Sequence, residues 1–142
     1  MRFNTFNFYI KNGHVIPALI HKCYLSKKNN KKFKVLGENT DKRNFLNSID
    51  AAKALIIIAQ KSNYNLINLG SSEEISIKKL AILIKKVSNN ENDISWGKID
   101  SKAVRKRQLD LSRINSLKFK EKFTIEEGLR ETYNWFANEQ IK

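Results

Sequence analysis

Few residues in this chain could carry out chemistry, and one of them stands where proton transfer is expected. His14 follows Gly13 directly before an apolar helical pattern, where an imidazole can point into a cleft. Because an ordinary histidine has a pKa of about 6.5, His14 is a candidate general acid or base at neutral pH. A histidine at a helix entry can instead bind backbone groups, and the residues alone leave that alternative open.

Other chemical signals are weak. Tyr24 and Lys28 have the spacing of a catalytic Tyr–Lys dyad, but Tyr24 belongs to an apolar helix face, and such pairs arise by chance in a Lys-rich chain. A dinucleotide site needs glycines two and three residues apart, whereas the five glycines here stand far from one another. One cysteine and two histidines argue against a structural zinc site. We therefore expect this chain alone to bind neither a dinucleotide cofactor nor a metal.

Length and composition favour one folded unit. The 142 residues, 41% of them hydrophobic, suit a single domain over residues 1–142. The longest apolar run, residues 54–59, is far shorter than the ~20 residues that span a bilayer. The N-terminus has no continuous apolar signal segment, and a lone Cys23 fits a reducing compartment. We expect a cytoplasmic protein without a membrane segment.

The strongly basic balance has two interpretations. A net charge of +13 could attract nucleic acid or another polyanion through release of counterions. Much of the excess, however, is Lys set among Asn and Ile, as in residues 27–32, which indicates a compositional bias of the whole chain. Solvated surface charge is the default for such runs, so nucleic-acid binding is not expected.

Hydrophobic spacing predicts a helix-rich α/β chain with short strands. Ser76 is predicted to cap a helix, and Thr124 with Glu127 forms a capping-box pattern before the last helix. The helix near 48–60 is rich in Ala and Ile and is predicted to be largely buried. His21 is expected on the polar surface of the first helix. The predicted helices start at Val15, near Ser48, after Ser76 and after Thr124, and the predicted strands are Phe33–Leu36, Asn65–Leu69 and Ile94–Trp96.

Five segments, in order along nearly the whole chain, resemble the GDP-L-fucose synthases. These are NADP-dependent nucleotide-sugar epimerase/reductases of the extended short-chain dehydrogenase/reductase superfamily. The resembling segments are residues 13–24 (GHVIPALIHKCY), 35–46 with VLG and RNFL, 68–80 (NLGSSEEISIKKL), 105–113 (RKRQLDLSR) and 126–133 (EEGLRETY).

The resemblance implies a particular part of such an enzyme. Family members are roughly twice as long as this chain, which looks like their C-terminal substrate-binding portion. The N-terminal Rossmann half, absent here, would carry the glycine fingerprint, the Tyr–Lys dyad and the NADP. The chain would then bind a nucleotide sugar, would not be catalytic alone, and would act with a separate Rossmann half or as a homodimer. Helices that pack on the absent sheet would expose apolar surface around Ala54 to Ala59. The alternative is a non-catalytic basic module binding nucleic acid or polyanion, or an inactive remnant.

The resemblance also assigns roles to four residues. His14 matches the family's acid/base histidine of the epimerisation step. Arg43 matches the arginine that holds the diphosphate of the substrate, and a guanidinium fork suits phosphate oxygens. Lys22 and Arg107 match cationic positions near the substrate, although both could equally be solvated members of a Lys-rich surface.

Overall fold

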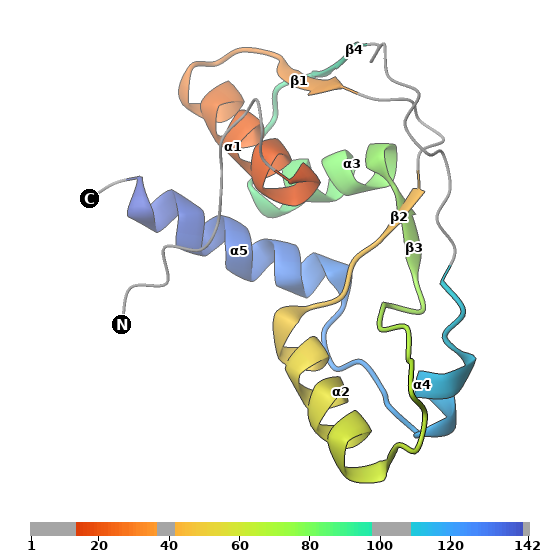
Figure 1. The fold of residues 1–142 in the computed structure, drawn as a ribbon. Helices are drawn as coiled ribbons and strands as arrows, with labels where there is room; N and C mark the ends of the chain where they lie inside the picture. Colours follow the sequence, from red (N-terminus) through yellow and green to blue (C-terminus); the bar gives the residue numbers. More distant parts are fainter. Residues whose placement is uncertain (1–13, 37–41, 98–108, 141–142) are drawn as a thin grey trace.

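The computed structural model describes residues 14–36, 42–97 and 109–140. Its helices and short strands alternate along the chain, as the hydrophobic spacing predicts (Figure 1). None of the described helices is long and apolar enough to cross a bilayer. The elements are α1 (Val15–Lys28), β1 (Phe33–Leu36), β2 (Lys42–Asn44), α2 (Ser48–Lys61), β3 (Glu74–Ser76), α3 (Ile77–Val87), β4 (Ile94–Gly97), α4 (Ser112–Ser116) and α5 (Ile125–Glu139).

The four strands form two separate pairs. β1 lies parallel to β4, with Phe33 opposite Ile94, so the pair needs the long connection that runs through the intervening elements. β2 lies antiparallel to β3, with Arg43 opposite Ile75. Strands β2 and β3 and the short α4 were not among the elements predicted from spacing, because three- to five-residue elements carry too few periods to be recognised.

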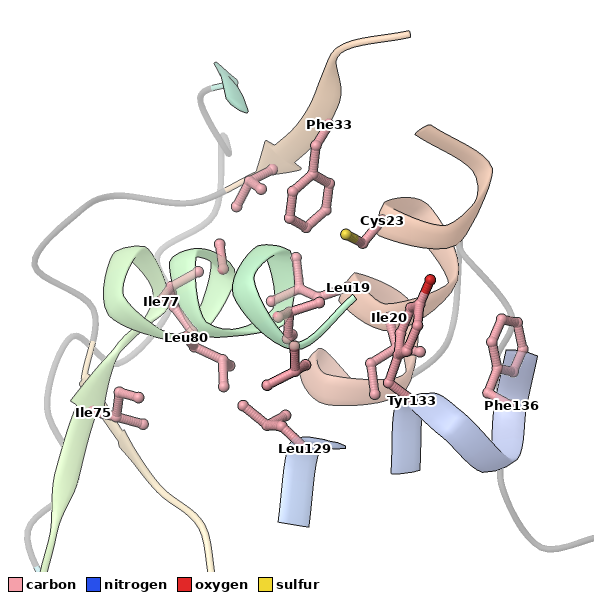
Figure 2. Close-up of a cluster of buried hydrophobic side chains, with 14 residues drawn as sticks. Leu19, Ile20, Cys23, Phe33, Ile75, Ile77, Leu80, Leu129, Tyr133 and Phe136 are labelled. Atoms are coloured by element: carbon pink, nitrogen blue, oxygen red, sulfur yellow. The ribbon is translucent and has the colours of Figure 1, made fainter. Parts of the chain in front are cut away.

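The hydrophobic core lies between α1, α3, α5 and β1. Figure 2 shows side chains from these elements pointing toward one another, with Ile75 of β3 at the edge. α3 presents one buried stripe, while its opposite face is exposed, which is the pattern of a helix packed on one side. The fully buried members include Ile20, Phe33, Leu80, Ile84 and Leu129. Burial of each such side chain contributes about 1.5–3 kcal/mol, so this cluster is the stable part of the fold.

The predicted helix starts are confirmed in detail. The Ser76 hydroxyl accepts a hydrogen bond from the Lys79 amide at 3.1 Å and caps α3. The Thr124 hydroxyl accepts from the Glu127 amide at 3.3 Å, while the Glu127 carboxylate accepts from the Thr124 amide at 2.8 Å. These reciprocal bonds satisfy amides that the first turn of α5 would otherwise leave unpaired.

Two predictions for the segment 48–70 are wrong. α2 is not largely buried: its buried residues are Asp50 and Ala54, while Leu55 and Ile56 are 59% and 58% exposed. The predicted strand at 65–69 is not a strand, since it has no ladder partner among the described residues. Both differences have one cause: α2 lies away from α1, α3 and most of α5, and no sheet formed by the described residues lies beside it (Figure 1).

Candidate functional site

A cavity of about 790 Å³ lies among the described residues. It is lined by the start of α1, by β2 and the loop after it, by the loop 71–73, by residues 121–125 and by one side of α5. Ligand pockets have volumes of about 300–1,000 Å³, so this cavity can hold a molecule of nucleotide size. His14 and Arg43, which come from different elements, both line it.

His14 stands at the N-cap of α1 with an extended backbone, φ −62° and ψ 158°. Its carbonyl accepts from the Ala18 amide at 3.0 Å, as a helix start requires, but its side chain makes no capping bond. Within the described residues, the His14 imidazole is therefore not held by backbone groups of the helix start, which was the alternative interpretation. The exposed ring is available to a ligand in the cavity.

Arg43 reaches the cavity from the centre of β2, where it is half-buried. One of its guanidinium nitrogens, Nη1, donates to the Lys42 carbonyl at 2.7 Å. No carboxylate pairs with it within the described ranges, where the ion pairs are Lys79–Glu73, Lys86–Glu126 and Arg130–Glu126. Because a guanidinium carries five N–H donors, Arg43 keeps donors for an anion.

The strand that carries Arg43 is joined to the loop 71–73 by the side chain of Asn44. Its Oδ1 accepts from the Ser71 amide at 2.7 Å, and its Nδ2 donates to the Ser71 carbonyl. Gly70 allows this approach, because a Cβ there would lie 2.7 Å from Asn44 Oδ1. The segment 68–72 (NLGSS) thus places two serines, Ser71 and Ser72, on the cavity wall.

Asp50 supports the opposite wall, a role that sequence reasoning missed. Its fully buried Oδ2 accepts from the amides of Lys122 and Phe123 at 2.9 and 3.0 Å, and both residues line the cavity. Its Oδ1 is buried and has no partner among the described atoms. An acidic residue in the first turn of an apolar helix was the available signal, but that pattern alone also fits a favourable interaction with the helix dipole.

The carboxylates near the cavity are already engaged. Glu121 accepts from the Ser72 amide at 2.8 Å and from the Ser72 hydroxyl at 3.1 Å. Glu73 pairs with Lys79 at 2.9 Å. Lys79 offsets the charge of Glu73, and Arg43, which has no carboxylate partner within the described ranges, offers the cavity a positive charge that can hold an anionic group.

The remaining predicted residues do not join this pair. Lys22 lies on α1 about two turns beyond His14 and does not line the cavity. Arg107 lies outside the described residues. The prediction that His21 lies on the surface is wrong. Its side chain is half-buried, and the centre of its ring lies 5.4 Å from that of Phe136 on α5. Tyr24, which also contacts Phe136, belongs to the apolar face as expected.

The described residues offer no metal centre and no fit for a dinucleotide. They contain no group of three or more His, Cys, Asp or Glu side chains able to hold an ion. The N-terminus of α3 follows β3 directly through Ser76, without the glycine turn that lets a backbone approach a pyrophosphate.

Comparison with known proteins supplies a context for this cavity. The model of the NAD dependent epimerase/dehydratase family matches residues 3–70. GDP-L-fucose synthase 1 of Arabidopsis thaliana is 31% identical over 132 residues, which are 92% of this chain and 41% of that protein. The GDP-L-fucose synthase of Dictyostelium discoideum is 30% identical and matches 93% of this chain.

Solved structures agree with the sequence relatives. A GDP-L-fucose synthetase from Naegleria fowleri, bound to NADP, superposes with a TM-score of 0.83 and 30% identity over 96% of this chain and 42% of its own. A UDP-glucose 4-epimerase from Thermotoga maritima, solved with UDP-glucose, has a TM-score of 0.77 at 19% identity and shows the fold alone. The chain thus spans about 42% of the length of the relatives it matches.

Proposed function

We propose that this chain, whose residues 3–70 match the model of the NAD dependent epimerase/dehydratase family, is the substrate-binding part of a nucleotide-sugar epimerase or reductase similar to GDP-L-fucose synthase. We place it in the C-terminal portion of such an enzyme, as one unit over residues 1–142. The cofactor would be held by the part of the relatives that this chain does not span.

One observation carries the proposal: Arg43 and His14 line the same nucleotide-sized cavity, and within the described residues no carboxylate pairs with Arg43 and no capping bond holds the His14 side chain. Arg43 holds the diphosphate through charge-assisted hydrogen bonds, which are stronger than neutral ones. Ser71 lines the same cavity, and its hydroxyl, which accepts from the Glu73 amide at 3.1 Å, can donate its proton to a further oxygen. The apolar side chains of Phe45, Ile75 and Leu129 supply the remaining wall against which sugar and base carbons pack.

His14 is the proton-transferring group of this proposal. Epimerising a carbon next to a ketone removes a proton from one face of the ring and returns a proton to the other. Two groups must therefore flank the sugar. The only cysteine, Cys23, is buried in the core and bonded to Ser88, and burial raises the pKa of its thiol, so it cannot serve. His14 supplies one group, and the other comes from the unmatched part.

Calorimetry with nucleoside diphosphates tests the proposal on the chain as it is. GDP, UDP and dTDP are titrated into the wild type, into Arg43→Ala and into Arg130→Ala. Arg130 is the matched control, since it forms an exposed ion pair with Glu126 away from the cavity. We expect binding that weakens about 10- to 100-fold in Arg43→Ala, the loss typical of a hydrogen bond to a charged group, and that is unchanged in Arg130→Ala. Equal affinity for all three proteins would remove Arg43 from the site.

The nucleoside diphosphate that binds most tightly distinguishes between members of the family. Preference for GDP would support the likeness to GDP-L-fucose synthase, whereas preference for UDP or dTDP would support another member of the family. Binding that rises with polyanion length and vanishes at moderate salt would instead favour the basic-module alternative.

A further inference from the structure

Gly128 lies in α5 at a place where packing between the described residues does not require a glycine. Its backbone is helical, and glycine destabilises a helix interior relative to alanine. A Cβ at this position would meet the Nδ2 atom of Asn47 at 3.4 Å, which is an ordinary contact distance. Gly128 also lines the cavity. Such a position is typical of a close approach between a bound molecule and the protein backbone.

Asn47 borders the same place with a side-chain amide whose orientation is fixed. Its Oδ1 accepts from the Ile49 amide at 2.8 Å and caps α2, so its Nδ2 is the branch that lies toward Gly128. This Nδ2 carries two N–H groups, and no acceptor among the described residues takes them. Because Asn47 lines the cavity, it offers a bound molecule a neutral donor that the helix cap holds in place.

The wall of α5 beside Gly128 is apolar. Ile125 and Leu129 lie within one turn of Gly128 and line the cavity with it. Thr132 lines it too, but its hydroxyl donates to the Gly128 carbonyl at 2.7 Å and has no proton left for a ligand. The Asn47 amide therefore stands at the edge of an apolar strip. A hexose ring suits this arrangement, because its C–H face packs on apolar atoms while its oxygens need donors at the rim.

His14 lies at the same end of α5. The helices α1 and α5 run in the same general direction (Figure 1), and they are in contact where the ring centres of His21 and Phe136 lie 5.4 Å apart. Two helical turns before this contact, α1 begins next to His14 and α5 carries Leu129, the neighbour of Gly128. Both residues line the cavity. A molecule that reaches the His14 imidazole therefore also lies beside Gly128.

We propose that the gap at Gly128 and the amide of Asn47 form the sugar subsite of the cavity. A hexose ring lies against α5 at Gly128, and one of its oxygens accepts a hydrogen bond from Asn47 Nδ2. This inference rests on the proposed function, in which Arg43 holds the diphosphate and His14 exchanges protons with the sugar. A methyl group at position 128 would take the place of part of the ring.

Calorimetry tests the subsite through the affinity that the sugar adds. GDP-L-fucose is compared with GDP, and UDP-glucose with UDP, on the wild type, Gly128→Ala and Asn47→Ser. Serine caps a helix as asparagine does, and alanine suits a helix interior, so both variants should fold. Asn134→Ala is the matched control, since Asn134 is exposed on α5 and lies outside the cavity lining.

We expect the wild type and the control to bind the sugar nucleotide of the preferred pair more tightly than its diphosphate. Gly128→Ala should weaken binding of that sugar nucleotide about 10-fold or more, and Asn47→Ser about 3- to 10-fold. Binding of the diphosphate alone should not change in either variant. The inference is overturned if neither sugar nucleotide binds more tightly than its diphosphate, or if the variants bind it as the control does. Weaker binding of the diphosphate itself would place the base at Gly128 and would also overturn it.

The side-chain amide of Asn47 supplies a second measurement that needs no nucleotide. L-fucose or D-glucose at millimolar concentration should shift its NMR signals in the wild type and in Asn134→Ala, but not in Gly128→Ala. Such shifts in a chain that binds neither GDP nor UDP would support the subsite while the proposed function fails. Diphosphate binding that depends on Arg43, with the Asn47 amide unmoved by either sugar or sugar nucleotide, would overturn the subsite and leave the proposed function intact.

Discussion

Asn44 and Ser71 are joined by two hydrogen bonds, with Asn44 Oδ1 accepting from the Ser71 amide and Nδ2 donating to the Ser71 carbonyl. The Asn44 side chain thus binds both the N–H and the C=O of one residue, as a neighbouring strand would. Because Asn44 follows Arg43 directly, this pairing fixes the strand that carries the guanidinium to the loop that carries Ser72. The relative positions of the anion-binding groups depend on it.

Gly70→Ala should disturb that pairing. The added Cβ would meet Asn44 Oδ1 at 2.7 Å and Leu109 Cδ1 at 2.8 Å. Overpacking of this kind costs about 1–3 kcal/mol of unfolding free energy, which denaturant titration measures. Gly128→Ala is the matched control, since its Cβ would meet only Asn47 Nδ2 at 3.4 Å and Ala favours the helix interior by about 1 kcal/mol. A Gly70→Ala chain as stable as the control would contradict the account.

Asp50→Ala should lower stability more than its place on an exposed helix suggests. The substitution removes the acceptor of the partly buried hydrogen bonds from the amides of Lys122 and Phe123, and a hydrogen bond to a charged group contributes about 1.5–3 kcal/mol. Site-resolved hydrogen exchange should show faster exchange at these two amides. Asp50→Asn, which keeps a carbonyl oxygen, should restore much of the protection. Unchanged exchange in Asp50→Ala would show that the wall is held by other contacts.

Glu127 should make the stability of α5 depend on pH, with a loss of stability in acid. Hydrogen bonds from the Thr124 amide, and next from its hydroxyl, lower the pKa of the Glu127 carboxyl from its ordinary value of 4.5. Because the folded pKa is the lower one, the contribution is complete well above 4.5 and is lost as the pH falls through the folded pKa. Thermal unfolding should therefore show a wild-type advantage over Glu127→Gln at pH 7 that disappears at strongly acidic pH. An advantage that persists undiminished in acid would contradict this.

The sequence predicted the packed part of the fold better than its periphery. Three helices, α1, α3 and α5, were predictable because each has apolar residues at helical spacing. Two of them also have a recognisable start signal, which is Ser76 for α3 and Thr124 for α5. The helix at 48–61 was predicted as well, but its burial and the strand at 65–69 were not found, because within the described residues no element covers Leu55 and Ile56 and no strand pairs with 65–69. A local hydrophobic pattern indicates which face of a segment is suited to burial. It does not indicate whether the element that would cover this face is present.

The candidate site shows the same division. His14 and Arg43 were identified through the resemblance, and the cavity they share was not visible in the spacing. Asn44 and Asp50 escaped attention because their importance comes from hydrogen bonds to Ser71 and to residues 122–123, far along the chain. Such long-range partners leave no periodic signal in the sequence.

His14→Asn should slow epimerisation in an enzyme completed with its unmatched part. Loss of one acid or base group costs about 10²–10⁴ in rate. Exchange of solvent deuterium into the keto sugar measures this proton transfer directly. Reduction of a keto sugar that is already epimerised should suffer much less, which makes it the internal control. If deuterium enters the keto sugar in His14→Asn at the wild-type rate, His14 has no part in this proton transfer.

The most direct test of the central claim is an NMR titration of the full chain with GDP, observing the imidazole of His14 and the guanidinium of Arg43. His21 is the internal reference, because it packs on Phe136 outside the cavity lining. Saturable shifts are expected at His14 and Arg43 of the wild type, with His21 unmoved, and the His14 shift should be lost in Arg43→Ala. Shifts confined to the lysines of residues 27–34, or none at His14 and Arg43, would contradict it.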